Sequence, residues 1–322
     1  MIIVTGGAGF IGSNIVKELN NRGRNDILIV DNLGKSDKYK NLIGLHYIDY
    51  LNKEKFFADL ESYCGGDVEA IFHEGACSDT MEYDVNYMIK NNYETSKTLL
   101  KFCDFRAIPL IYASSASTYG GGKNGFFEDD KCEDALNPYA FSKLLFDRYV
   151  RQFIPNAQTK IIGLRYFNVY GPQEAHKGKM ASIFYQLYNQ IKATGSAKLF
   201  KGIDGYNDGE QLRDFVYVKD VVKVNLWCLD NNIKNGVYNC GTGQAHTFNE
   251  AAQAVINAVG TGKIEYRDFP DGLRGKYQSY TQADVNKLIK AGYDGSFTDI
   301  NQAVKEYCQL LDKNGGYYSY VQ

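Results

Sequence analysis

Tyr139 and Lys143 are the pair in this chain best suited to acid–base chemistry. They lie four residues apart, and a helix places residues at that spacing on one face. A phenol with a pKa of about 10 is a poor base at neutral pH. A neighbouring ammonium stabilises the phenolate and lowers its pKa, so that the tyrosine can take a proton from a sugar hydroxyl. Because the chain has 26 tyrosines, an exposed helix that carries both residues without function is the alternative.

Ser115 is a candidate third member of this group. An apolar run over residues 109–113 predicts a strand, and the chain continues as Ser-Ser-Ala-Ser-Thr-Tyr-Gly over residues 114–120. In a doubly wound sheet, the carboxyl ends of the strands face the ligand crevice. Ser115 is then placed to hydrogen-bond the reacting oxygen. A polar turn with capping serines is the alternative.

A glycine-rich turn near the start of the chain predicts a dinucleotide site. The apolar residues 1–4 predict a buried strand, and a helical pattern follows the turn. The turn contains Gly6, Gly7, Gly9 and Gly12. Glycines let the backbone approach a pyrophosphate, and the N–H groups and dipole of the helix N-terminus stabilise its charge. A second predicted strand, residues 27–30, ends at Asp31, about where a ribose-binding acid is expected. An ordinary tight turn between strand and helix is the alternative.

The elements that position these residues alternate in type through the first half of the chain. Strand-like runs occupy residues 2–4, 27–30, 45–48, 70–73, 109–113 and 160–166. The segments between them are long enough for helices. This alternation predicts βαβ units and an α/β fold with a Rossmann-type, doubly wound parallel sheet.

Loops become frequent from about residue 168, which predicts a second unit. Strands at 215–218 and 237–239, around a helix at 219–230, are expected to return to the sheet. We therefore predict a Rossmann domain over 1–167 plus 214–243, and a smaller, mixed α/β substrate domain over 168–213 and 244–322. The Tyr- and Gly-rich residues 315–322 are expected to form a loosely held tail.

Composition disfavours several classes of protein. The net charge is −2 and no basic block indicates a nucleic-acid partner. No apolar run reaches the ~18 residues of a membrane span, and a strand beginning at residue 1 leaves no room for a signal peptide. The seven cysteines are scattered without metal-like spacing. We therefore expect reduced thiols, no metal site and a cytoplasmic location.

These motifs, taken together, resemble the extended short-chain dehydrogenase/reductase family over almost the whole chain. The matching segments are Thr-Gly-x-x-Gly-x-x-Gly at 5–12, Phe-His-Glu-Gly-Ala at 72–76, Tyr-x-x-x-Lys at 139–143 and Arg-Tyr-Phe-Asn-Val-Tyr-Gly-Pro at 165–172. The resemblance implies a set of cofactor contacts. These are Gly6, Gly9, Phe10, Ile11, Gly12, Asp31, Asn32, Lys38, Lys53, Glu74, Gly75, Ala76, Cys77, Ser78, Asn91, Lys143, Val169 and Lys177.

Epimerases, 4,6-dehydratases and reductases of nucleotide sugars all belong to this family. Its dehydratases resemble one another in an Asp-Glu pair after the active-site hydroxyl residue. Here Ala116 and Ser117 hold those places, and neither can perform that acid–base work. Within the family the chain is most similar to the 6-epimerases of ADP-linked heptose, which supply heptose for lipopolysaccharide. The matching strings include MIIVTGGAGFIGSNIVKELN, HKGKMAS and YQSYTQAD.

A second acid/base, Lys177, follows from this resemblance. Such an epimerase oxidises C6 of the heptose to a planar ketone and reduces it from the opposite face. A hydroxyl on either face needs its own proton acceptor, so Tyr139 and Lys177 serve opposite faces. A solvated lysine in a Lys-Gly-Lys loop is the alternative.

Further residues are expected to touch the substrate on the strength of the same resemblance. They are Asn168, Lys179, Gln186, Phe200, Lys201, Gly202, Arg213 and Tyr277. The guanidinium of Arg213 also suits phosphate chemically. Residues 203–211 form a longer and more acidic stretch than in these relatives, which leaves the nucleotide and the sugar open.

Charges after the second and third predicted strands bear on the choice between NAD and NADP. Asp31 alone bonds a ribose 2′-hydroxyl and repels a 2′-phosphate, which favours NAD. Asn32 follows it, and Lys38 and Lys53 lie where they can neutralise such a phosphate. The resemblance implies tightly bound NADP, regenerated in its oxidised form in each cycle.

Two other functions stay open. An epimerase acting at C4 of a UDP- or GDP-sugar uses one tyrosine and has no need of Lys177. A non-catalytic regulator that senses NADP(H) has no need of Ser115, Tyr139 and Lys143 together. The resemblance also implies a homo-oligomer, namely a pentamer.

Overall fold

A parallel sheet of seven strands forms the centre of the molecule, in the computed structural model that describes residues 1–270, 272 and 277–319. Its order is β11-β6-β5-β4-β1-β2-β3. The strands are β1 (Ile2–Thr5), β2 (Ile27–Asp31), β3 (Asp49–Asn52), β4 (Ala70–His73), β5 (Leu110–Ser115), β6 (Ile161–Tyr166) and β11 (Gly236–Cys240). The strand order reverses between β1 and β4, and such a switch point opens the ligand crevice of a doubly wound sheet.

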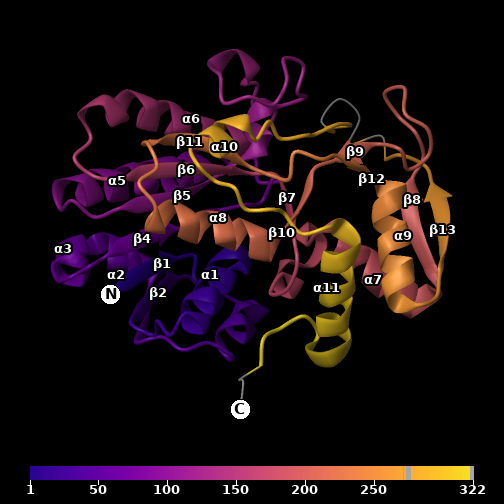
Figure 1. The fold of residues 1–322 in the computed structure, drawn as a ribbon, viewed down its shortest axis with the longest axis horizontal. Helices are drawn as coiled ribbons and strands as arrows, with labels where there is room; N and C mark the ends of the chain where they lie inside the picture. The colour runs from indigo at the N-terminus through magenta and orange to yellow at the C-terminus, as the bar shows by residue number, and fades with distance from the viewer. Residues whose placement is uncertain (271, 273–276, 320–322) are drawn as a thin grey trace.

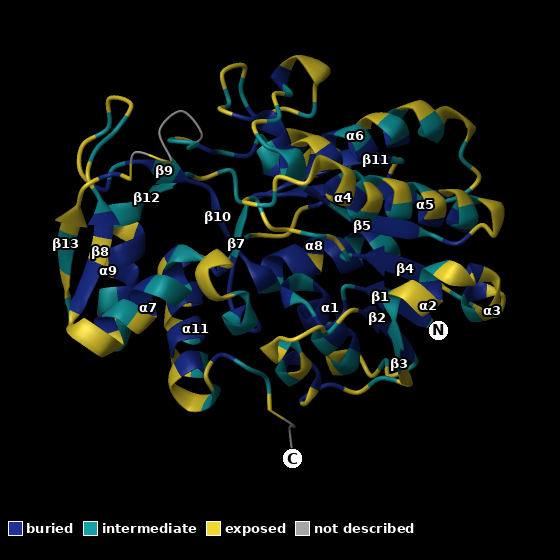
Figure 2. Ribbon diagram, turned by 180° about the vertical axis from the view of Figure 1, so that it is seen from behind, coloured by how far each residue is buried: buried dark blue, intermediate teal, exposed yellow. Residues whose placement is uncertain are grey.

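Helices cover both faces of this sheet, as Figures 1 and 2 show. One face packs on α1 (Phe10–Asn21) and α8 (Val218–Asp230). The other packs on α2 (Lys53–Ala58), α3 (Leu60–Cys64), α5 (Thr95–Phe105) and α6 (Pro138–Phe153). Successive strand residues point to opposite faces, so Ile2 and Val4 join the first cluster and Ile3 joins the second. The strands therefore read as continuous apolar runs, as in other sheets buried on both faces.

Shorter helices connect these layers. They are η1 (Asp37–Leu42), α4 (Val85–Met88), η2 (Ile89–Glu94, a π-helical segment), η3 (Ala116–Tyr119), η4 (Asp130–Cys132) and η5 (Ile154–Asn156).

A second unit lies beside the sheet and has its own apolar core. Its helices are η6 (Ala175–Met180), α7 (Ile183–Thr194), α9 (Phe248–Val259) and α11 (Ile300–Asn314). The short helix α10 (Asn286–Lys290) packs instead on β11 of the central sheet, and its Leu288 belongs to the core of that sheet. Its strands pair two by two: β8 (Ser196–Phe200) with β13 (Lys263–Arg267), β9 (Leu212–Arg213) with β12 (His246–Thr247), and β7 (Asn168–Tyr170) with β10 (Phe215–Tyr217). The core contains residues of α7, α9 and α11, so the unit is built around these helices.

The structure confirms the α/β fold and corrects three local predictions. The third strand, expected at 45–48, lies at Asp49–Asn52, a largely polar edge strand without an apolar signature. The strand expected at 215–218 to return to the sheet pairs instead with β7, whereas β11 does return. The expected loose tail is held by hydrogen bonds through residue 319, because Gly316 and Tyr318 bond to Gln173. Residues 320–322 of that tail lie outside the described residues.

Several properties of the described chain bear on its chemistry. No helix there has the length and apolar character needed to cross a membrane. No group of three or more His, Cys, Asp or Glu side chains is arranged in it to hold a metal ion. All seven cysteines are free thiols, and all but Cys77 are buried.

Candidate active site

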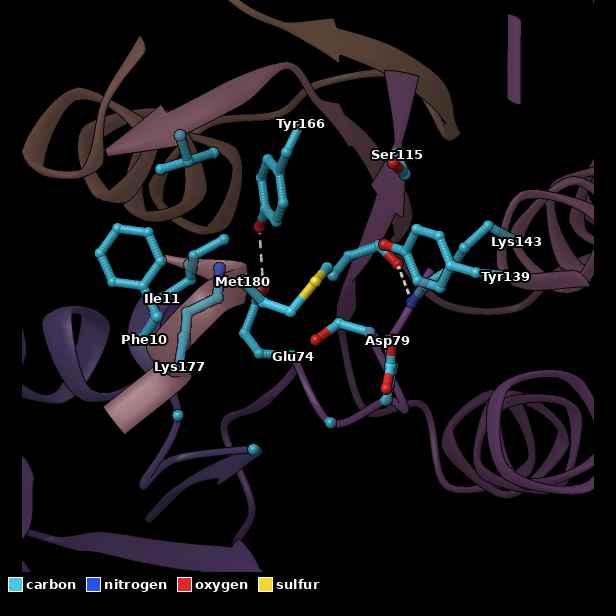
Figure 3. A pocket seen from close by; sticks show the side chains of 18 of the residues that line it. Phe10, Ile11, Glu74, Asp79, Ser115, Tyr139, Lys143, Tyr166, Lys177 and Met180 are labelled. Atoms are coloured by element: carbon cyan, nitrogen blue, oxygen red, sulfur yellow. Dashed lines mark hydrogen bonds between the residues drawn. The ribbon is translucent and has the colours of Figure 1, made fainter. Parts of the chain in front are cut away.

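Two adjoining cavities open at the carboxyl ends of the central strands, with volumes of about 480 and 690 Å³. They share Gly6, Asp31, Lys38, Gly75 and Ala76, so they form one continuous crevice. The first contains the candidate catalytic residues, which Figure 3 shows, and the second extends along β2.

The glycine turn forms a close-fitting cradle at the base of this crevice. A Cβ atom added to Gly6, whose φ is +67°, would lie 2.7 Å from the backbone of Glu74. One added to Gly12 would lie 2.3 Å from the carbonyl oxygen of Gly6. Gly9 is the N-cap of α1, and it offers no side chain to cap the helix. Bare backbone at a helix N-terminus fits a pyrophosphate, so the cradle suits the dinucleotide that the sequence predicts.

Asp31 joins the cradle to the second cavity. Its Oδ2 accepts a hydrogen bond from the Ala8 N–H at 2.9 Å, which fixes the glycine turn. Its Oδ1 lies 2.6 Å from Lys38 Nζ, so the lysine offsets the carboxylate charge. Lys53, across the cavity, donates from Nζ to Asn91 Oδ1 at 2.9 Å. This end of the crevice therefore balances an acid against nearby lysines.

Every residue predicted to contact the cofactor lines one of the two cavities. Asn32, Lys53, Cys77 and Asn91 line the second cavity only. Lys143, Val169 and Lys177 line the first. Their contacts with a bound cofactor stay a prediction.

The candidate catalytic residues come from adjacent elements at the mouth of the sheet. Ser115 ends β5, and Tyr139 and Lys143 lie in the first turns of α6. That helix begins where it does because the Asn137 side chain accepts a hydrogen bond from the Ala140 N–H at 2.8 Å. All three side chains line the first cavity, as predicted, and Lys143 Nζ donates to the Ala113 carbonyl oxygen at 2.8 Å.

Burial dominates the electrostatics of this group. It raises the pKa of Tyr139, and the hydrogen bond with Ser115 opposes that rise. It lowers the pKa of Lys143 to about 8, against the attraction of Glu74 and Asp147. The predicted lowering of the Tyr139 pKa by Lys143 is therefore wrong for this arrangement, because the phenol is buried and the ammonium is bound to Ala113.

Lys177 reaches the same cavity from the second unit. It lies on η6, and its Nζ is 5.1 Å from the centre of the Phe10 ring at the start of α1. Figure 3 shows Lys177 beside Phe10 and Ile11, across the cavity from Ser115 and Tyr139. Burial lowers the pKa of its amine, which the carboxylate of Glu174 opposes. The structure thus brings together two candidate proton acceptors that lie far apart in the sequence.

The predicted substrate residues Phe200, Arg213 and Tyr277 form part of a separate aromatic cluster around a guanidinium. Arg213 is buried, with its guanidinium carbon 4.7 Å from the centre of the Tyr277 ring and 5.5 Å from that of Phe248. Phe269 lies between Tyr277, which it meets edge to face, and Phe200, to which its ring is tilted, at 5.1 and 5.3 Å between ring centres. A flat guanidinium among aromatic faces suits a nucleotide with its phosphates.

The other predicted substrate residues have varied surroundings. Asn168 Nδ2 donates to Thr281 Oγ1 at 3.0 Å, which ties the end of the sheet to the second unit. Gln186 donates to the Ala181 carbonyl oxygen, and Lys201 pairs with Asp268. Lys179 is exposed, and the Gly202 N–H donates to Asp208. None of the predicted substrate residues, all of which are described, lines either of the two cavities.

Comparison with known proteins assigns the chain to a family. The model of the NAD dependent epimerase/dehydratase family matches residues 2–241. The chain belongs to this family. Its dinucleotide site is accordingly one for a nicotinamide dinucleotide.

The relatives of this epimerase/dehydratase include several named epimerases of nucleotide sugars. It is 55% identical over 98% of its length to an ADP-L-glycero-D-manno-heptose-6-epimerase of Brachyspira hyodysenteriae, of which it covers 99%. It superposes on the crystal structure of the Helicobacter pylori ADP-L-glycero-D-manno-heptose-6-epimerase with a TM-score of 0.83 and 32% identity, covering 97% and 96% of the two chains. It also matches a UDP-N-acetylglucosamine 4-epimerase of Methanobrevibacter ruminantium, with a TM-score of 0.84, 25% identity and coverage of 97% and 98%.

Sequence reasoning missed several residues that line the first cavity of this epimerase/dehydratase. They include Asp79, Tyr166, Phe167, His176 and Met180. Tyr166 donates its hydroxyl to Glu74 Oε1 at 2.9 Å, and burial raises the pKa of that carboxyl to about 7. Tyr166 and Phe167 lie within the 165–172 motif, and His176 directly precedes Lys177. Their places in or next to these motifs could have marked them as residues of the site. Their approach to the cavity depends on how the two units pack.

Proposed function

We propose that the protein inverts C6 of the heptose in ADP-D-glycero-D-manno-heptose and so forms ADP-L-glycero-D-manno-heptose. The observation that carries this proposal is the position of Lys177, which faces Tyr139 across one cavity beside the glycine cradle. When the C6 carbonyl turns over between the two hydride transfers, its oxygen lies on opposite sides of the cavity, and an acid/base on each side serves the two orientations. The 55% identical relative bears the name of this activity.

Different residues of the chain would perform different steps of such a reaction. The glycine cradle would hold the nicotinamide dinucleotide, which would supply a hydride acceptor and donor for C6. Tyr139 or Lys177 takes the proton of the C6 hydroxyl as the ketone forms, and the other residue supplies a proton to the opposite face. Ser115 hydrogen-bonds the reacting oxygen, and Lys143, on the same helix face as Tyr139, contacts the bound cofactor. The aromatic cluster around Arg213 holds the nucleotide end of the substrate.

We further propose that the cofactor is NADP. The support is the ion pair of Lys38 with Asp31, together with Lys53 across the second cavity. An acid whose charge is already offset does not repel a 2′-phosphate as a free one would. The glycine cradle would hold the pyrophosphate of either dinucleotide, so these lysines would determine the selection of NADP over NAD.

The oligomeric state and location belong to the same proposal. We expect a homo-oligomer, with a pentamer as the state that the family resemblance implies, and light scattering measures it directly. The free thiols favour a reducing compartment such as the cytoplasm.

Substitution of Lys177 separates the proposed reaction from epimerisation at C4. We expect Lys177→Ala to lower kcat on ADP-D-glycero-D-manno-heptose by about 10²-fold or more, the usual effect of losing an acid/base. The dinucleotide content of the same variant, measured after denaturation, separates loss of the acid/base from loss of cofactor. Lys101→Ala, an exposed lysine on α5, is the matched control. Full activity of Lys177→Ala would contradict the two-acceptor proposal.

A further inference from the structure

The segment that follows α11 crosses from the second unit to the start of the chain. The helix ends at Gly315 and Gly316, whose φ values of +63° and +83° turn the backbone in a way that favours glycine. Figure 1 shows this yellow segment leaving α11 and running towards the indigo N-terminal part of the molecule. We refer to residues 315–319 as the C-terminal strap.

Specific contacts fasten the strap to its surroundings. The Tyr318 hydroxyl donates to Asn14 Oδ1 on α1 at 2.6 Å. Its N–H donates to Gln173 Oε1 at 3.2 Å, and the Gly316 carbonyl oxygen accepts from the Gln173 N–H at 2.8 Å. The strap also lies so close to Gly44 that a Cβ atom there would be 2.5 Å from the Tyr318 carbonyl oxygen. The strap is therefore a fitted part of the fold.

Gln173, the partner of the strap, is held in a conformation that a free chain disfavours. Its φ is +73°, in the left-handed region that costs a non-glycine residue energy, and its side chain is buried. The strap holds it on one side. On the other, Asn41 Nδ2 donates to the Gln173 carbonyl oxygen at 3.0 Å, and Gln173 Nε2 donates to the Asn41 carbonyl oxygen at 2.9 Å.

The contacts of Gln173 connect the strap to both sides of the active site. Asn41 Nδ2 also lies 2.9 Å from the Ala8 carbonyl oxygen in the glycine turn and 3.2 Å from His176 Nδ1. Asn14 Nδ2 donates to the Pro172 carbonyl oxygen at 3.0 Å. The backbone that leads into Lys177 is thus anchored by groups from the strap, α1 and η1.

We propose that Tyr318 is a positioning residue, whose side chain acts through Asn14 and whose backbone acts through Gln173 to hold the segment that carries Lys177 at the cavity. This inference rests on the proposed function, because it assigns the strap to the second proton acceptor. If the strap served only the stability of the fold, weakening it would speed amide exchange in all regions of the protein alike. If the strap positions Lys177, weakening it speeds amide exchange in residues 172–178 before it does so elsewhere.

Hydrogen exchange tests the mechanical part without any substrate. Tyr318→Phe removes only the hydroxyl that reaches Asn14, and Tyr318→Ala removes the whole side chain. We expect faster amide exchange in a peptide covering residues 172–178 in both variants, more so in Tyr318→Ala, with the central strands unchanged. Tyr317→Phe makes the same atomic change one residue earlier and should match the wild type. Unchanged exchange at 172–178, or faster exchange throughout, would overturn the proposal.

Single-turnover kinetics on ADP-D-glycero-D-manno-heptose test the catalytic part. We expect Tyr318→Ala to lower the rate about tenfold through misplacement of Lys177, with the dinucleotide content unchanged. In a Lys177→Ala background the same substitution should not lower the rate further. The effects of two substitutions are not additive when the two residues act as a unit. Equal losses in both backgrounds would overturn the proposal. A wild type without turnover would instead refute the proposed function, and the exchange data would still decide the role of the strap.

Discussion

At the scale of single residues, the candidate site places a proton acceptor on each side of one cavity. Tyr139 projects from the first turn of α6 beside Ser115, and Lys177 projects from η6 against the ring of Phe10. Both are partly buried, and this burial raises the pKa of Tyr139 and lowers the pKa of Lys177, so that each neutral form is favoured. A neutral amine can take up a proton and a neutral phenol can give one up, so Lys177 and Tyr139 are suited to opposite halves of one proton exchange.

Tyr139→Phe removes the phenol hydroxyl and keeps the ring. We expect kcat to fall by about 10²- to 10⁴-fold, the range typical of a lost general acid/base. The cofactor should remain bound, because the glycine cradle is untouched. Tyr149→Phe, on the same helix, is the matched control, and steady-state kinetics with dinucleotide content measure both effects. Wild-type turnover in Tyr139→Phe would exclude the tyrosine as the acceptor.

Lys38→Ala removes the ammonium that lies 2.6 Å from Asp31. The carboxylate then faces the second cavity without its partner, so a 2′-phosphate is repelled. We expect the affinity for NADP to fall about tenfold relative to that for NAD, as for the loss of one charge-assisted contact. Equilibrium binding to protein stripped of its dinucleotide measures both constants. An equal loss for both dinucleotides would argue against NADP selection by Lys38.

At the scale of elements, the site depends on close approach of backbones around the glycine turn. Gly6 and Gly12 bring β1, β4 and the start of α1 together more tightly than any side chain permits. Asp31 at the end of β2 fixes the same turn through the Ala8 N–H. The cradle is therefore a property of several elements at once.

Gly12→Ala tests that close approach. The new methyl group would lie 2.3 Å from the Gly6 carbonyl oxygen, so the turn must shift. We expect the variant to lose most of its dinucleotide, and its melting temperature to fall. Gly66→Ala, where a Cβ atom meets nothing within 4 Å, is the matched control. Dinucleotide absorbance after denaturation reports the content, and full retention in Gly12→Ala would contradict the cradle.

Local patterns in the sequence were enough to predict most of these elements. The glycine turn, Asp31 and the Tyr139–Lys143 pair each depend on neighbouring residues, so spacing alone locates them on the correct strand, loop or helix. The edge strand at Asp49–Asn52 was missed because it lacks an apolar run and none of its four residues is buried. The pairing of β10 with β7 was missed because a short apolar run does not specify its partner.

Local sequence patterns could not predict the parts of the site that depend on packing between residues far apart in the chain. Lys177 is indistinguishable in sequence from a surface lysine, and family resemblance alone marked it. The bond between Tyr166 and Glu74 and the contacts of Tyr318 join residues that lie far apart in the chain. Such contacts follow from how the two units meet.

At the scale of the whole molecule, the cavity lies where the sheet meets the second unit. Tyr139 comes from the helices that cover the sheet, whereas Lys177 comes from a helix that follows β7. Glu74 lies at this junction, buried and bonded to Tyr166. The packing of the two units thus creates both the site and an unusual carboxyl group.

That carboxyl group makes stability depend on pH. The pKa of Glu74 is raised from 4.5 to about 7, so the folded protein keeps a proton that the unfolded chain has lost. This contribution is complete below pH 4.5 and is lost as the pH rises through 7, a change of about 3 kcal/mol. Glu74→Gln should therefore gain stability relative to the wild type across that window. Urea unfolding at several pH values measures it, and a constant difference would contradict the raised pKa.

The most direct test of the account is to incubate the purified protein with ADP-D-glycero-D-manno-heptose in D₂O, without added cofactor, and to follow C6 by NMR. We predict inversion at C6 with the original hydrogen retained, because a bound nicotinamide removes and returns the same hydride. No inversion, or deuterium at C6 of the product, would contradict the account.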